Sequence, residues 1–152
     1  GGAISGVELK KVLRNVYDIE LEMAGVNYAV AMSGAGDTRD NFSALENALF
    51  AIDDTLSERN GLTKTITPIL PQKAVDPCKT NGLSGEYVDF DKSSGKISLE
   101  NVWAYPPGSP IIVKGEIVCQ DDIKNLTLMY ENGVSVSSET RRFPSQILVE
   151  KQ

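Results

Sequence analysis

The chain contains no histidine. This absence excludes Ser-His-Asp and Cys-His nucleophile systems, histidine general acid–base catalysis and every metal site with a histidine ligand. Any catalysis by this chain alone must therefore depend on carboxylate, lysine, tyrosine, serine or cysteine side chains. No group of other ligands takes the place of histidine in the sequence, so no metal site is predicted.

Cysteine is also scarce, because Cys78 and Cys119 are the two present and they lack a CxxC spacing. This usage is typical of free thiols in a reducing cytoplasm, although a single bridge between the two stays open. No apolar run approaches the ~18 residues of a membrane span, and the N-terminal residues lack a signal-peptide pattern. The sequence thus predicts a cytoplasmic globular protein without a membrane segment.

Basic residues do not form a stripe. The formal net charge is −6, and the nearest basic clusters are the pairs Lys10-Lys11 and Arg141-Arg142. Proteins that bind nucleic acids neutralise phosphates with clustered lysine and arginine. Nucleic-acid binding is therefore not expected. The 152 residues, 41% of them hydrophobic, are enough to bury a core of their own.

The N-terminal residues predict a helix followed by a hairpin. The stretch Ser5-Gly6-Val7-Glu8 has the form of a capping box, and apolar residues then recur at helical spacing, so a helix is expected over residues 6–17. Apolar and acidic residues alternate over 19–23, and a more apolar run covers 28–32. These two runs predict a pair of strands.

A second helix is expected after the Gly-rich stretch 33–41, with Asp37 or Thr38 as its N-cap and Asn60-Gly61 as its stop. The stretch lacks the lysine of a P-loop and the full GxGxxG pattern, so it is interpreted as a strand-to-helix turn rather than an anion cradle. The apolar stripe of the helix consists of Phe42, Leu45, Leu49, Ile52 and Leu56.

The remaining sequence predicts strands around a third helix. This helix is expected over residues 120–130, with Asp121 or Asp122 as its N-cap and Asn132-Gly133 as its stop. Strands and helices do not alternate regularly along the chain. The predicted fold class is therefore α+β, with small, mostly antiparallel sheets and about three helices.

Three parts are predicted along the chain. Residues 1–62 form a helix–hairpin–helix subdomain, and residues 85–152 form a strand-rich C-terminal subdomain. Between them, residues 63–84 contain three prolines and show no clear period, which is typical of a connector.

The stretch Trp103 to Glu116, WAYPPGSPIIVKGE, predicts a rigid corner between two strands. Pro106 and Pro107 fix their own φ angles and favour an extended residue before them, and Gly108 allows a turn that a side chain would forbid. One interpretation is a stiff corner whose aromatic side chains pack in the core. The other is that Tyr105 and Glu116 face a cleft, where the carboxylate could pair with a cationic ligand.

Other acidic and thiol groups have simpler interpretations. Glu20 and Glu22 share one face of the first strand, and Asp89 with Asp91 are too few acids for a Ca²⁺ loop. Cys119 has no basic neighbour close in sequence that would lower the pKa of its thiol. None of these groups is expected to be catalytic.

Three segments carry a resemblance to a known family. Residues 95–118, GKISLENVWAYPPGSPIIVKGEIV, resemble the bacterial ornithine/lysine/arginine decarboxylases, where G-[RK]-I-S-x-E precedes PYPPGIP, an apolar run and PGE. Residues 6–41 resemble the opening of the small domain of that family, and residues 132–151 resemble its end. The sequence departs from the family at Ser109, where the family has isoleucine, and at Lys114, where it has proline.

The resemblance implies the C-terminal domain of a pyridoxal-phosphate-dependent decarboxylase of ornithine, lysine or arginine. In that family a large N-terminal domain of aminotransferase type anchors the cofactor through a lysine in a Ser-x-His-Lys context, and the intact enzyme is a homodimer or larger. The opening Gly-Gly, without Met, also indicates a piece of a longer chain. The fragment alone is therefore expected to hold no cofactor and to be inactive.

The resemblance also implies site residues. Tyr105 and Glu116 are expected to bind substrate as part of the channel wall, and Pro106, Pro107 and Gly108 are expected to hold the corner in shape. No residue of this chain is expected to be catalytic. An alternative is a non-catalytic ligand-binding or assembly module with the same fold.

Overall fold

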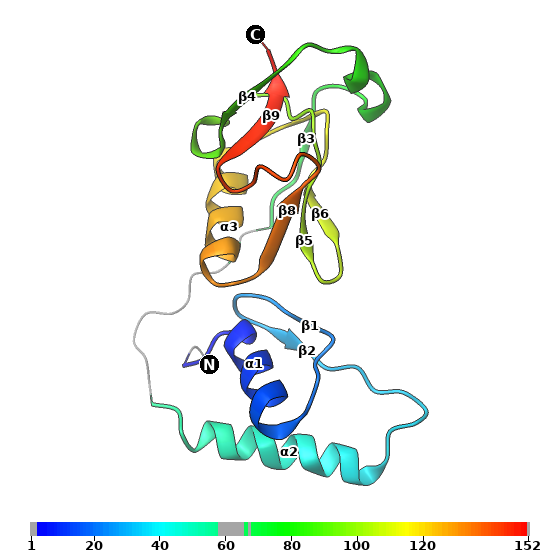
Figure 1. Cartoon of the computed structure of the whole chain (residues 1–152), viewed down its shortest axis with the longest axis vertical. Helices are drawn as coiled ribbons and strands as arrows, with labels where there is room; N and C mark the ends of the chain where they lie inside the picture. The colour runs from blue at the N-terminus through cyan, green and yellow to red at the C-terminus, as the bar shows by residue number, and fades with distance from the viewer. Residues whose placement is uncertain (1–2, 58–65, 67, 152) are drawn as a thin grey trace. The chain divides into compact units, whose positions relative to one another are not determined.

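The computed structural model describes residues 3–57, 66 and 68–151. The chain divides into two compact units, Gly1–Thr65 and Ile66–Gln152, here called unit 1 and unit 2 (Figure 1). All paired strands are antiparallel, and the described residues contain three α-helices. The predicted α+β class is confirmed.

Unit 1 begins with helix α1, Gly6–Tyr17, at the predicted bounds. The Ser5 hydroxyl accepts the Glu8 N–H at 3.1 Å, and the Glu8 carboxylate accepts the Ser5 N–H at 3.1 Å, so the capping box is formed. The helix ends at Asp18, whose φ of 55° lies in the left-handed region.

A short hairpin follows, and it is smaller than predicted. Strands β1, Met23–Ala24, and β2, Ala29–Val30, pair antiparallel, and the rest of the runs 19–23 and 28–32 lies outside the ladder. Each strand has one described neighbour, so most of the apolar run over 28–32 finds no strand to pair with. Met32 is 73% exposed as a result.

Helix α2, Arg39–Asp53, has Thr38 as its N-cap, one of the two predicted caps. The Thr38 hydroxyl accepts the Asn41 N–H at 3.4 Å, and the Asn41 side chain accepts the Thr38 N–H at 2.8 Å. The helix ends before the predicted stop at Asn60-Gly61, which lies outside the described residues. The buried core of unit 1 consists of Leu13, Leu21, Ala48 and Ile52.

Unit 2 contains helix α3, Gln120–Glu131, and seven strands. Strands β6, β5 and β8 form one sheet, and β3–β7 and β4–β9 form two pairs (Figure 1). The strand bounds are β3 Gln72–Lys73, β4 Gly85–Asp89, β5 Val102–Tyr105, β6 Ser109–Ile112, β7 Glu116–Ile117, β8 Ser135–Ser138 and β9 Gln146–Glu150. Short 3₁₀ helices cover Pro77–Gly82 and Phe90–Lys92.

The N-cap of α3 corrects one prediction. The cap is Cys119 rather than Asp121 or Asp122. The Asp122 carboxylate accepts the Cys119 N–H at 2.8 Å, and the Cys119 sulfur accepts the Asp122 N–H at 3.4 Å. Asp122 therefore takes the acidic position of a capping box, three residues after the cap. Its negative charge also interacts favourably with the positive N-terminal end of the helix dipole.

The described part of the predicted connector 63–84 belongs to unit 2. Strand β3 pairs with β7, and the 3₁₀ helix Pro77–Gly82 follows it. The N–H groups of Ala74 and Val75 both donate to the Gly115 carbonyl at 2.9 Å. The division into residues 1–62, 63–84 and 85–152 remains a prediction of how the chain is organised.

The segment 97–101 joins the β-pairs of unit 2. Ser98 donates its N–H to the Glu116 carbonyl at 2.8 Å, and the Gly115 N–H donates to the Ser98 carbonyl at 2.7 Å. On the other side, the Leu99 N–H donates to the Leu148 carbonyl at 2.9 Å. The segment thus lies between β7 and β9, although it is not part of a regular strand.

Glu100 fixes this segment from inside unit 2. Its side chain is fully buried. One carboxylate oxygen accepts the N–H and hydroxyl of Thr140 at 2.9 and 2.8 Å, and the other accepts the Leu148 N–H at 2.7 Å. A buried carboxylate is tolerated when hydrogen bonds replace its hydration, so these three donors account for its position.

We expect Glu100→Ala to lower the free energy of unfolding by about 3 kcal/mol, because three donors lose their acceptor inside the protein. Glu100→Gln keeps one acceptor oxygen and should cost about half as much. Urea denaturation followed by fluorescence measures both. Glu131→Ala, a change at the exposed end of α3, is the matched control, and an equal effect of all three variants would contradict the prediction.

Candidate functional site

The predicted corner is the turn that joins β5 to β6. Residues 106–108 connect the two strands, and Ala104 pairs with Ser109 next to the turn. Gly108 has a φ of 95° and donates its N–H to the Ala104 carbonyl at 3.0 Å. A positive φ of this size disfavours any residue with a side chain, which is why glycine occupies the position.

Tyr105 projects from this turn and is 62% exposed. The preceding aromatic residue, Trp103, is half-buried. The interpretation that both aromatic side chains pack in the core is therefore wrong for Tyr105. An exposed tyrosine on a stiff turn is available for contact with a ligand or with another part of the protein.

Glu116 closes a second turn, Val113 to Glu116. The Val113 N–H donates to the Glu116 carboxylate at 2.9 Å, and the Glu116 N–H donates to the Val113 carbonyl at 3.0 Å. Gly115, with a φ of 92°, occupies the third position of the turn. The half-buried Glu116 side chain thus has a structural role within its own turn.

Tyr105 and Glu116 lie at opposite ends of the β5–β6 hairpin. Tyr105 is at the connecting turn, whereas Val102 pairs with Ile112 at the other end, beyond which the Glu116 turn begins. Roughly 10 Å of paired strand separates the two ends. The structure therefore does not bring the two predicted residues together at one point of the hairpin.

Asn101 connects the Glu116 turn to the loop after β8. Its side-chain oxygen accepts the Lys114 N–H at 2.9 Å, and its side-chain nitrogen donates to Glu139 at 2.7 Å. The Lys114 ammonium lies 3.8 Å from the same Glu139 carboxylate. Sequence reasoning missed the roles of Glu100 and Asn101. Glu100 is the final acid of the quoted motif G-[RK]-I-S-x-E, and Asn101 is the next residue.

Two of the acidic side chains noted in the sequence, Glu20 and Asp89, form ion pairs. Glu20 contacts Lys10 at 3.1 Å and Arg14 at 3.2 Å, and Asp89 contacts Lys92 at 2.6 Å. Among the described residues, no group of three or more potential ligands is arranged to hold a metal ion. Likewise, none of the described helices combines the length and the apolar character needed to cross a membrane.

The two cysteines are free thiols, as predicted. Burial raises the pKa of the Cys119 thiol, and the interaction with the Asp122 carboxylate raises this pKa further, whereas the Asp122 backbone N–H that donates to the sulfur lowers it. Because the thiolate is the nucleophile, a raised pKa lowers the reactive fraction at neutral pH. The prediction that Cys119 is not a reactive thiol is consistent with this environment.

Two exposed lysines, Lys73 and Lys92, lack the environment of a Schiff-base lysine. A Schiff-base lysine needs a lowered pKa, whereas hydrogen bonds to Asp76 and Asp89 raise the pKa values of Lys73 and Lys92. The sequence also has no histidine to stack on the cofactor ring.

Three helices and small antiparallel sheets, with a rigid aromatic–proline turn in unit 2, place the described residues in the α+β class. The family model described as "Orn/Lys/Arg decarboxylase, C-terminal domain" matches residues 60–136. The chain belongs to this family.

Curated relatives agree with this placement. An arginine decarboxylase of Bacillus subtilis is 28% identical over 136 residues, which cover 88% of this chain and 28% of the relative. An arginine decarboxylase of Halalkalibacterium halodurans is 30% identical over 133 residues, which cover 85% of this chain and 26% of the relative. The chain thus spans little more than a quarter of these relatives.

Solved structures show the same fold. The constitutive lysine decarboxylase of E. coli superimposes with a TM-score of 0.68 at 14% identity, over 97% of this chain and 28% of that one. The lysine decarboxylase of Francisella novicida gives a TM-score of 0.66 at 15% identity, with the same coverage. The likeness therefore extends over both units, although the family model begins near the start of unit 2.

Gly115→Ala is expected to lower the free energy of unfolding by about 3 kcal/mol, because the new Cβ would overlap the Val75 carbonyl in addition to the cost of the positive φ. Gly95 also has a positive φ but open space around it, so Gly95→Ala should cost only about 1–2 kcal/mol. Equal losses in thermal or urea unfolding would show that close approach does not matter at Gly115.

Alkylation should separate the two cysteines. We expect iodoacetamide to modify the exposed Cys78 faster than the half-buried Cys119 at pH 7.5, with the rate at Cys119 still rising as the pH increases above the ordinary thiol pKa. Peptide mass spectrometry over time measures both rates. Denaturant should make the two rates similar, and equal rates in the folded protein would contradict the expectation.

Proposed function

We propose that this chain is the C-terminal part of a pyridoxal-phosphate-dependent decarboxylase of a basic amino acid. Membership of the Orn/Lys/Arg decarboxylase family carries the proposal. Arginine is the first substrate to test, because the curated relatives above are named arginine decarboxylases. Lysine and ornithine are the other two substrates that the family description names.

The cofactor belongs to the larger N-terminal domain in this proposal. Pyridoxal phosphate supplies an electron sink for the loss of CO₂. This chain has no histidine and therefore no Ser-x-His-Lys context for the cofactor, so the chain alone is expected to be inactive. Its role is to shape one wall of the substrate channel and to exclude water there.

Tyr105 and Glu116 are assigned separate contacts with the channel. Tyr105 is the stronger candidate, because it is exposed on a turn that Gly108 and two prolines keep rigid. Glu116 would oppose the cationic end of a basic substrate with the carboxylate oxygen that does not accept the Val113 N–H. Because roughly 10 Å of paired strand separates the two residues, we assign them two contact points rather than one.

The proposed enzyme is cytoplasmic and forms a homodimer or larger assembly. Two free thiols are typical of a reducing compartment. The partner of this chain is the large domain of the same protein, and the ligand is the basic amino acid. The net charge of −6 gives no support for a nucleic-acid partner.

The test is release of CO₂ from arginine, lysine and ornithine by the full-length protein with added pyridoxal phosphate. We expect activity with one of the three, and none from the 152-residue chain alone. Absence of activity with all three would overturn the proposal. Tight calorimetric binding of these amino acids to the chain alone would instead favour a non-catalytic ligand-binding module.

Glu116→Gln should raise the KM of the full-length enzyme for its basic substrate by about tenfold, the change expected for loss of ~1.4 kcal/mol of binding. Glutamine can still accept the Val113 N–H, so the turn and kcat should be preserved. Steady-state kinetics measure both constants. Glu131→Gln at the exposed end of α3 is the control, and an unchanged KM in Glu116→Gln would refute the assigned role.

A further inference from the structure

Helix α2 is apolar over a wider arc than unit 1 buries. Ala48 and Ile52 face the core, whereas Phe42, Leu49 and Phe50 are 53%, 41% and 64% exposed. A helix that is apolar on more than one face is normally covered on more than one side. The outer face of α2 therefore carries large apolar side chains that its own unit leaves in contact with solvent.

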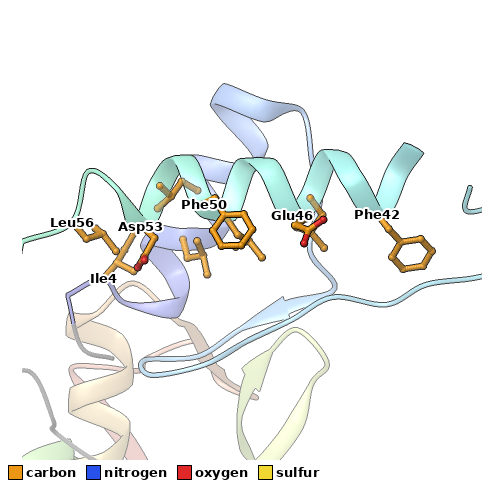
Figure 2. A pocket seen from close by; sticks show the side chains of 10 residues that line it. Ile4, Phe42, Glu46, Phe50, Asp53 and Leu56 are labelled. Atoms are coloured by element: carbon orange, nitrogen blue, oxygen red, sulfur yellow. The ribbon is translucent and has the colours of Figure 1, made fainter. Parts of the chain in front are cut away.

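These side chains border a groove with a volume of about 640 Å³. Its lining includes Ile4, Leu9 and Leu45, and Phe42 and Phe50 of the same lining lie along α2 (Figure 2). All lining residues belong to unit 1. Contiguous apolar hollows of this kind on a protein surface mark contact with another protein segment or ligand.

The groove also has a charge pattern. Glu46 lies between Phe42 and Phe50 along α2, and Asp53 lies near the C-terminal end of the helix (Figure 2). The two residues are seven positions apart in the helix, which corresponds to roughly 10 Å along its axis. The groove thus suits an apolar surface that carries lysine or arginine opposite these two positions.

In the proposed function, unit 1 lies between the larger N-terminal domain and unit 2 in the sequence. The model of the C-terminal domain begins at residue 60, close to the boundary between the units, so almost all of unit 1 precedes it. Nearly three quarters of each curated relative lies outside the region that matches this chain. Unit 1 is therefore the part of the chain adjoining the larger N-terminal domain in sequence.

We propose that the apolar groove of α2 is the docking surface for the larger N-terminal domain of the same protein. This inference rests on the part of the proposed function that places such a domain before the chain. Unit 1 contributes α2 to a core that the N-terminal domain completes. Phe42 and Phe50 insert into that domain, and basic side chains on it face Glu46 and Asp53.

A second copy of this chain is a poorer occupant. Two copies related by a two-fold axis would bring the same surface patch together. The carboxylates of Glu46 and Asp53 would then approach those of the other copy, and each chain already carries a net charge of −6. Repulsion between like charges opposes that arrangement.

The test is hydroxyl-radical labelling of the 152-residue chain and of the full-length protein, read by mass spectrometry. Phe90, buried in unit 2, is a slow reference of the same side-chain type, and Val16, 68% exposed on α1 outside the groove, is a second reference. In the chain alone, Phe42 and Phe50 should label much faster than Phe90. In the full-length protein, their labelling should fall to the level of Phe90.

The second experiment uses the variant Phe50→Asp. In the full-length protein, this change should restore labelling of Phe42 and lower the urea concentration at the midpoint of unfolding. The midpoint of the 152-residue chain alone should not change. Val16→Asp is the control and should leave Phe42 protected from labelling in the full-length protein.

Fast labelling of Phe42 and Phe50 in the full-length protein would overturn the proposal. So would a dimer of the chain alone that Phe50→Asp dissociates in sedimentation, since a second copy would then cover the groove.

Labelling does not depend on turnover, so this test and the activity assay can fail separately. A protected groove in a protein inactive with all three amino acids would refute the proposed function and leave the docking surface. An active enzyme with a freely labelled groove would refute the docking surface alone.

Discussion

The buried carboxylate of Glu100 is the interaction on which unit 2 depends. It accepts three hydrogen bonds from Thr140 and Leu148, residues that lie 40 and 48 positions further along the chain. These bonds hold segment 97–101 between β7 and β9. Because Ser98 and Asn101 of this segment contact the turn that ends at Glu116, the position of that turn follows from the same carboxylate.

Local signals in the sequence were enough to predict the helices. The capping box at Ser5 and Glu8 gives the start of α1, and the cap at Thr38 gives that of α2. The N-cap of α3 was missed because cysteine is an uncommon cap, while the acids after it are common ones. The hairpin strands were predicted too long, since strand length depends on neighbouring strands that a local pattern does not reveal.

For the candidate site, the sequence predicted which residues form the rigid turn but not how Tyr105 and Glu116 lie relative to each other. Gly108 and the two prolines indicate a rigid turn, and the turn is there. The register of β5 against β6, which sets Tyr105 and Glu116 at opposite ends of the hairpin, depends on pairing that the sequence does not specify. The role of Glu100 was equally hidden, because its donors come from distant loops and strands. Alternation of apolar and polar residues carries no information about such contacts.

The long sequence separation of the Glu100 hydrogen bonds has a consequence for folding rates. Loop closure over 40 to 48 residues precedes any gain from these bonds, whereas the hydrogen bonds within helices α1 and α2 join residues close in sequence. Helices α1 and α2 should therefore form before the Glu100 hydrogen bonds when a denatured chain is diluted from urea. Trp103, the one tryptophan, belongs to β5, so its fluorescence reports the slower phase, and far-UV circular dichroism also records the earlier formation of α1 and α2.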